Sequence, residues 1–256
     1  MKSNTCRSAK ARILLVFAWL LTHQFLSVYA GEATNPQEGT KRVDLRPNFT
    51  KWKLELKKQG TRNTCSVFTT VAAMEYTLSK KFDRGFPLSE EYLNWACNKV
   101  INNTDQDRGQ FFAHLLQGYE QYGICREEEM PYARKFYPQY EPSVRAINSA
   151  KIICSYGLKG RWIKPNDGKV GITDEHIAQI KATLRNGWPV CGGSAHSVLL
   201  VGYEDDVSQP GSGRFFVRDP GAGNQQAMTY AEAKARLCDL LWFEATTSRG
   251  DSSSLK

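Results

Sequence analysis

The sequence lacks the signatures of a metal centre and is poor in histidine. Only four histidines occur in 256 residues. Six cysteines follow residue 30, none of them in a Cys-x-x-Cys pair and none with a histidine at metal-binding spacing. Structural and catalytic zinc sites need such clusters of thiolate and imidazole ligands. Six cysteines are also too sparse for a small domain held together by disulfides. We therefore expect no metal and no other cofactor.

Acidic residues are absent from the first thirty positions, which carry four basic residues and an apolar run at residues 13–21. The run is followed by small residues at positions 28 and 30, in the order Val-Tyr-Ala. A basic start, a short apolar stretch and such a site are typical of a secretory signal peptide. We predict a signal peptide at residues 1–30 and export to a secreted or periplasmic location. The alternative is an uncleaved N-terminal anchor. No later segment is apolar enough to span a membrane, so we expect no stable membrane insertion after cleavage.

The mature protein is accordingly expected to begin at Gly31. N-terminal sequencing of exported material is the measurement that checks this cleavage. A protein that still carries Met1 after export would contradict the prediction and favour the anchor.

Long charged stripes and internal repeats are also missing. Removal of the first thirty residues lowers the net charge from +8 to +4, and the remaining basic residues are scattered. We therefore expect no nucleic-acid partner. Residues 31–42 are polar, residues 43–245 alternate between apolar segments and turns, and residues 246–256 form a Ser-rich tail that we expect to be disordered. The central part suits one domain, or two lobes that share a cleft, and we expect a monomer.

Helical periodicity dominates the first half of the chain, and strand patterns dominate the second half. We expect helices at residues 65–78, 89–96, 111–122, from 173 or 174 to 186, and 230–237. Asn63 or Thr64, Ser89 and Thr229 are the expected N-caps. We expect strands at residues 198–201, 214–218 and 240–244, the first two forming a hairpin. This order favours the α+β class with two unlike lobes.

Cys65 stands where the first long helix is expected to begin. A helix N-terminus carries partial positive charge, which favours a thiolate over a thiol, and the thiolate is the nucleophilic form. Gln59 precedes it by six residues, and its amide N–H is able to hold an oxyanion together with the Cys65 N–H. The alternatives are a structural cysteine on an amphipathic helix and a solvated glutamine in a loop.

Only three histidines follow the predicted signal peptide, which narrows the choice of a general base. His114 is expected to pack within a helix, and His176 is expected to face solvent in the first turn of another. His196 directly precedes residues 197–201, which contain the expected strand, and we choose it as the base. Asp219 ends the next strand, and the hairpin returns it toward His196, where we expect its carboxylate to accept the Nδ1–H. The alternative is an aspartate that only begins the turn at Pro220.

These residues together resemble the papain-like cysteine peptidases. The resemblance extends from about Val43 to Asp219 and rests on residues 43–47 (VDLRP), 59–60 (QG), 65–68 (CSVF), 88–93 (LSEEYL), 122–124 (YGI), 130–132 (MPY) and His196 with 198–203 (VLLVGY). It implies a helical lobe and an antiparallel β lobe with the active-site cleft between them. It also implies catalytic roles for Cys65, His196 and Gln59, substrate binding at Gly109 and Gln110, and peptide or protein substrates.

The departures from the family pattern are as informative. Arg62 replaces a cysteine that usually forms a disulfide, and Ser66 replaces a tryptophan. Gln110 stands in place of a second subsite glycine. Only five residues lie between Val190 and His196, which shortens the segment that lines the specificity pocket. Asp219 followed by Pro220 resembles the double-glycine-leader peptidases, a distant branch with a Cys-His-Asp triad. Only twelve residues separate Ala30 from Val43, so we expect no encoded inhibitory pro-segment.

Two functional hypotheses follow. The first is a secreted cysteine peptidase that hydrolyses peptide or related amide bonds through a Cys65 acyl-enzyme, with His196 as base and Asp219 as orienting group. The second is a papain-fold binding module that has lost catalysis, which the shortened pocket and missing tryptophan favour.

Overall fold

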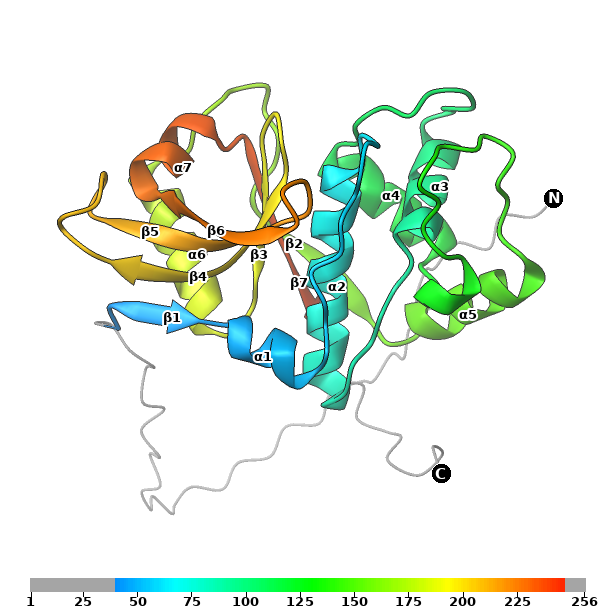
Figure 1. The fold of residues 1–256 in the computed structure, drawn as a ribbon, viewed down its shortest axis with the longest axis horizontal. Coiled ribbons are helices and arrows are strands. Elements are labelled where there is room, and N and C mark those ends of the chain that lie inside the picture. Colours follow the sequence, from blue (N-terminus) through cyan, green and yellow to red (C-terminus); the bar gives the residue numbers. More distant parts are fainter. Residues whose placement is uncertain (1–39, 247–256) are drawn as a thin grey trace, which may run out of the picture.

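The computed structural model describes residues 40–246, which form two unlike lobes (Figure 1). The predicted signal peptide and most of the predicted tail lie outside the described residues. The helical lobe contains α2 (Cys65–Phe82), α3 (Glu90–Val100), α4 (Phe112–Tyr122), the short 3-10 helix η1 (Glu127–Glu129) and α5 (Val144–Cys154). The β lobe carries α6 (Asp174–Arg185) and α7 (Tyr230–Arg236) on its sheet. The expected α+β class, with a helical lobe beside an antiparallel sheet, is confirmed.

A seven-stranded sheet forms the β lobe. Its order is β2 (Leu158–Lys164), β7 (Asp239–Ala245), β3 (Val190–Gly193), β4 (Val198–Asp205), β5 (Gly213–Asp219) and β6 (Asn224–Thr229). The N-terminal β1 (Arg42–Asp44) pairs with β4 and leads into α1 (Arg46–Lys51). All pairs are antiparallel. The last of the described strands, β7, thus lies between β2 and β3.

The predicted hairpin of β4 and β5 is confirmed, and its register matters for the site. Leu199 pairs with Arg218 across the two strands. Because antiparallel partners stand opposite each other, the start of β4 lies beside the end of β5. His196, two residues before β4, and Asp219, the last residue of β5, therefore lie at the same edge of the sheet.

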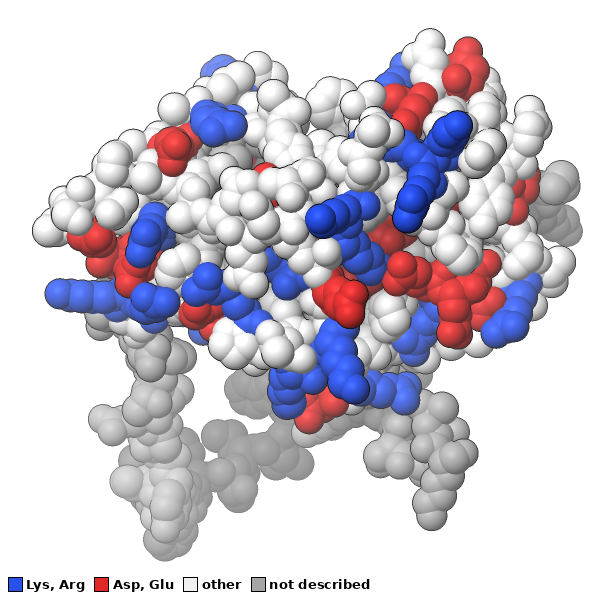
Figure 2. Space-filling model, in the orientation of Figure 1, with Lys and Arg blue, Asp and Glu red and all other residues white. Residues whose placement is uncertain are grey.

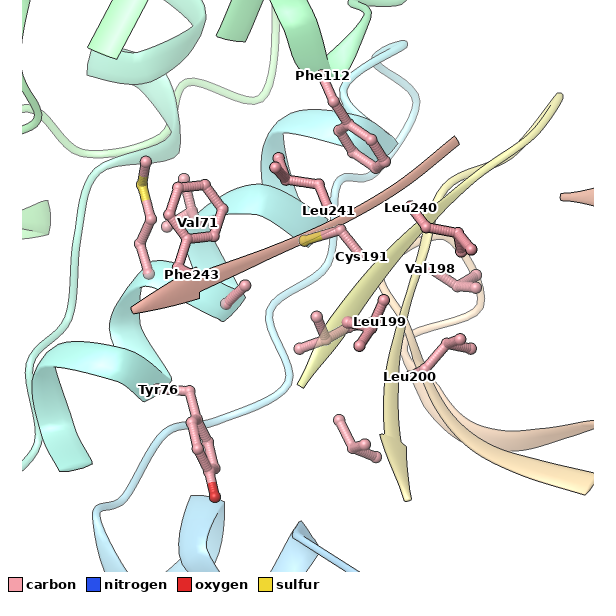
Figure 3. Packing of buried hydrophobic residues seen from close by; sticks show 14 of the residues in the cluster. Val71, Tyr76, Phe112, Cys191, Val198, Leu199, Leu200, Leu240, Leu241 and Phe243 are labelled. Atoms are coloured by element: carbon pink, nitrogen blue, oxygen red, sulfur yellow. The ribbon is translucent and has the colours of Figure 1, made fainter. Parts of the chain in front are cut away.

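Helix α2 lies between the two lobes and forms the centre of the core (Figure 1). It packs against β7, β4 and β3. Figure 3 shows Val71 of α2 beside Leu241 and Phe243 of β7, with Cys191 of β3 next to them. The helix runs four residues beyond the predicted end at Leu78, to Phe82, and Asp83 then turns the chain with a left-handed φ of 47°. This packing fixes the position of the first residue of α2 relative to the sheet.

The N-caps follow the sequence signals, with one exception. Ser89 accepts the Tyr92 N–H, and Thr173 and Thr229 each form a capping box. Thr64 occupies the cap position of α2, but its side chain makes no capping hydrogen bond. Its hydroxyl is instead bonded to the Tyr132 hydroxyl at 2.7 Å. The prediction of a capping side chain at residue 63 or 64 is therefore wrong, because a tertiary contact takes the hydroxyl.

Charges of both signs alternate over the face in Figure 2, without a continuous basic stripe. The expected lack of a nucleic-acid partner stays a prediction. Between residues 40 and 246, no helix is both long and apolar enough to cross a membrane.

Candidate active site

Cys65 is the first residue of α2 and is half-buried between the lobes. Burial acts to raise the pKa of its thiol, but hydrogen bonds from His196 and from the backbone and side chain of Ser197 act in the other direction and prevail. The pKa of Cys65 is therefore lowered. The N-terminal end of α2 favours the same anionic form.

His196 connects Cys65 with Asp219. Its Nε2 lies 2.7 Å from Asp219 Oδ1, so Nδ1 is the ring nitrogen left for the hydrogen bond with Cys65. We expected the carboxylate on Nδ1, and that expectation is wrong. The sequence places the residue but does not set the rotation of its ring, which follows from the position of the ring between α2 and the end of β5.

Asp219 is held by three donors on a single oxygen. Besides His196, the backbone N–H groups of Gly221 and Ala222 donate to Oδ1 at 2.8 and 3.2 Å. Burial acts to raise the pKa of this carboxyl, but these hydrogen bonds lower it below its usual value. The pKa of His196 is raised to about 9, mainly by the hydrogen bond with Cys65 and against the effect of burial, with Asp219 adding to the increase. The arrangement therefore favours a thiolate and an imidazolium side by side.

Gln59 lies in the loop before α2 and is tied to both lobes. Its backbone N–H donates to Pro220 O at 3.1 Å, and its backbone oxygen accepts from the Tyr132 hydroxyl at 2.9 Å. Its side-chain Nε2 donates to Arg62 O at 2.8 Å. A primary amide carries two N–H bonds, and Arg62 O takes only one of them.

Comparisons with known proteins agree with this arrangement at the level of the fold. No family model matches the chain, and no curated protein matches it. Among solved structures, it is similar to xylellain, a cysteine protease from Xylella fastidiosa, with 18% identity over 80% of this chain and 86% of that one, and a TM-score of 0.62. The chain has the papain-like fold.

Two further solved structures have the same fold. One is the digestive procathepsin L 3 of Tenebrio molitor larval midgut, with 19% identity, a TM-score of 0.57 and coverage of 82% of this chain and 71% of that one. The other is the Amb a 11 cysteine protease of ragweed pollen in its proform, with 17% identity, a TM-score of 0.59 and coverage of 83% and 69%.

The loop before α4 carries the two residues that we predicted to bind substrate. Gly109 is exposed and has open space where a side chain would project. Gln110 is buried, and its amide donates to Asn98 Oδ1 at 2.6 Å while its oxygen accepts from the Cys97 thiol at 3.1 Å. The Gln110 side chain thus anchors the loop to α3, and only its backbone is left for a substrate.

The burial of Arg62 is the main feature of this candidate site that we did not predict from the sequence. Its side chain is only 2% exposed and donates to Glu91 at 2.6 Å and to Ala133 O at 2.8 Å, with Asp107 at 3.4 Å. The guanidinium also lies 4.8 Å from the centre of the Tyr132 ring. A buried ion pair therefore joins the loop that bears Gln59 to α3.

A partly buried ion cluster supports the same loop. The Lys57 ammonium lies 2.8 Å from Glu75 of α2, 2.9 Å from Glu90 of α3 and 2.9 Å from Glu127 of η1. Burial acts to lower the pKa of Lys57, but the carboxylates outweigh it and raise the pKa.

The other histidines and cysteines lie outside the site. His114 is half-buried beside Phe111, and His176 is only partly exposed because it belongs to the capping box of α6. Within residues 40–246, no group of three His, Cys, Asp or Glu side chains is arranged to hold a metal ion. Five free thiols are found there, at residues 65, 97, 125, 191 and 238. Burial raises the pKa of Cys97 and Cys125 to about 12, and it raises that of Cys191 well above its usual value.

Proposed function

We propose that the protein is a cysteine peptidase that hydrolyses peptide or related amide bonds through an acyl-enzyme on Cys65. The observation that carries the proposal is His196 bonded to Asp219 at 2.7 Å, at the edge of the sheet that faces Cys65. The lowered pKa of Cys65, to which His196 contributes, agrees with it. The papain-like fold of three solved cysteine proteases supports it. We also propose that the protein is exported, that its mature form begins at Gly31, and that its peptidase domain spans residues 43–245.

In the first half of the reaction, the Cys65 thiolate attacks the substrate carbonyl carbon, and the carbonyl electrons move to its oxygen. The Cys65 N–H and the free N–H of Gln59 stabilise that oxyanion. When the intermediate collapses, the C–N bond breaks, and the imidazolium of His196 gives its Nδ1 proton to the leaving amine. A thioester then joins the acyl group to Sγ.

In the second half, water attacks the thioester while neutral His196 accepts a proton at Nδ1. The C–S bond breaks, the acid leaves, and the thiolate and imidazolium are restored. Asp219 holds Nε2–H throughout and so keeps Nδ1 toward Cys65. Gly109 and the backbone of Gln110 are the proposed contacts for the acyl side of the substrate.

Labelling with iodoacetamide tests the activated thiolate without a known substrate. We expect Cys65 to react faster than the other cysteines and to remain reactive at mildly acidic pH, because its pKa is lowered. Cys238 is the only other described free thiol that is not buried, so the Cys238→Ala variant is the control that isolates the Cys65 signal. The pH profile is read by mass spectrometry of the labelled peptides.

Labelling that rises only near the free-thiol pKa of about 8.5 would contradict the proposal. It would favour the alternative of an inactive binding module. If Cys65 is labelled at mildly acidic pH but the protein cleaves no member of a peptide library, Cys65 remains the proposed nucleophile. The substrate would then be sought among other amides or in acyl transfer.

A further inference from the structure

The turn after β5 lies directly against the His196–Asp219 pair. A Cβ atom added at Gly221 would stand 2.8 Å from His196 Cε1, 3.1 Å from His196 Nε2 and 3.3 Å from Asp219 Oδ1. Non-bonded carbon atoms are in contact at about 3.5–4.0 Å, so van der Waals repulsion excludes a separation of 2.8 Å unless one of the groups is displaced. A side chain at residue 221 would therefore occupy space that the imidazole and carboxylate now use.

Backbone conformation does not explain the glycine. Gly223, two residues later, has a φ of 63°, in the left-handed region that favours glycine, whereas Gly221 is not among the residues with positive φ. Gly221 is also exposed on its outer side. The demand for glycine at residue 221 comes from the close approach to the ring.

The backbone of the turn is fixed more firmly than the ring is. The N–H groups of Gly221 and Ala222 donate to Asp219 Oδ1, and Pro220 O accepts from Gln59 N at 3.1 Å. The imidazole, in contrast, is the end of a side chain that is 37% exposed. When a methyl group is added at residue 221, the ring is the part that moves.

We propose that Gly221 is a positioning residue. Because it has no side chain, the turn packs directly against the His196 ring and holds the ring between Asp219 and Cys65. The same residue thus contributes an N–H that holds the carboxylate and a bare Cα that sets the rotation of the ring. This inference rests on the proposed role of His196, but it concerns a residue two positions beyond the Cys-His-Asp set.

The test is Gly221→Ala, examined in three ways. We expect kcat to fall at least about tenfold with KM nearly unchanged, because small misplacements of a catalytic group cost rate rather than binding. We expect the midpoint of Cys65 alkylation to move up toward about 8.5, because the imidazolium no longer stabilises the thiolate. We expect the thermal midpoint to stay close to that of the wild type, and a larger effect on kcat from Gly221→Val.

Two comparison variants make the outcome decisive. Asn224→Ala changes an exposed residue near the turn. We expect it to leave kcat and the midpoint of Cys65 alkylation unchanged. Gly223→Ala strains a left-handed residue and is expected to lower the thermal midpoint. The proposal would be overturned if Gly221→Ala had the same kcat and the same alkylation midpoint as the wild type. It would also be overturned if Gly221→Ala lost as much thermal stability as Gly223→Ala. If wild-type Cys65 itself alkylates as an ordinary thiol, the proposed function fails instead.

Discussion

Arg62→Met is expected to lower the free energy of unfolding by about 3–5 kcal/mol, because it leaves the carboxylate of Glu91 buried without its cation. The Glu91 side chain is only 5% exposed, and Arg62 is only 2% exposed. Water therefore cannot replace the lost partner, and the Ala133 N–H at 2.9 Å is the one donor that stays on the carboxylate. Methionine fills part of the space but also gives up the contact with Tyr132.

A matched control lies on α3, the helix that carries Glu91. Lys99 of α3 pairs with Glu141 at 2.6 Å, but the two side chains are 44% and 54% exposed. An exposed pair contributes about 0–1 kcal/mol, so Lys99→Met should change stability little. Urea unfolding of both variants measures the difference. Equal losses in the two variants, or a loss below about 1 kcal/mol for Arg62→Met, would contradict the importance of burial.

The double variant Arg62→Met with Glu91→Leu separates the cost of an unpaired charge from the value of the pair. Replacing both members of a buried pair with apolar residues is often nearly neutral. We therefore expect the double variant to recover most of the stability lost in Arg62→Met. Failure to recover would assign the loss to Asp107, Ala133 and Tyr132, which Arg62 also contacts.

Local signals explain how much of the fold could be predicted from the sequence. The apolar spacing of α2, the caps at Ser89 and Thr229 and the turn between β4 and β5 are each decided within a few residues, and the structure confirms them. Helix α5 was missed for a local reason as well. Its buried residues are the small Ala146 and Ala150 with Ile153, whereas Val144 and Ile152 face solvent. Its apolar pattern therefore does not mark its buried face.

Long-range contacts explain what could not be predicted. The insertion of β7 between β2 and β3, the ring nitrogen of His196 that Asp219 contacts, and the inward direction of Gln110 all depend on residues far away in the chain. We could expect Cys65, His196 and Asp219 to lie together from the sequence because each stands at or beside the end of an element with a strong local pattern. Arg62 has no such pattern, since its partners lie 29 and 71 residues away.

Asp219→Ala is expected to lower kcat by about two decades or more, whereas Asp219→Asn is expected to lower it by only about one decade. An asparagine oxygen accepts the same hydrogen bonds, from His196 Nε2 and from the N–H groups of Gly221 and Ala222. Exchange of a charge-assisted bond for a neutral one costs about 1–2 kcal/mol, or roughly tenfold in rate. Alanine accepts none of them, so the imidazole is free to turn away from Cys65.

The pH profile separates the two effects of the carboxylate, orientation and charge. The pKa of His196 is raised to about 9, first by the hydrogen bond with Cys65, against burial, and then by Asp219. Loss of the negative charge removes one cause of that increase, so the pKa falls and the imidazolium is lost at a lower pH. In Asp219→Asn, the alkaline limb of kcat/KM, which reports the free enzyme, should therefore begin below its position in the wild type.

The competing role for Asp219 is that it only begins the turn at Pro220. In that case the two variants would lower the thermal midpoint by similar amounts and would hydrolyse peptides equally well. Peptide-hydrolysis rates and thermal midpoints of both variants, with Cys65→Ala as the inactive reference, distinguish the two roles. Equal activity would remove Asp219 from the site and leave a Cys65–His196 dyad, whereas a gap of a decade or more requires the carboxylate to act through the imidazole.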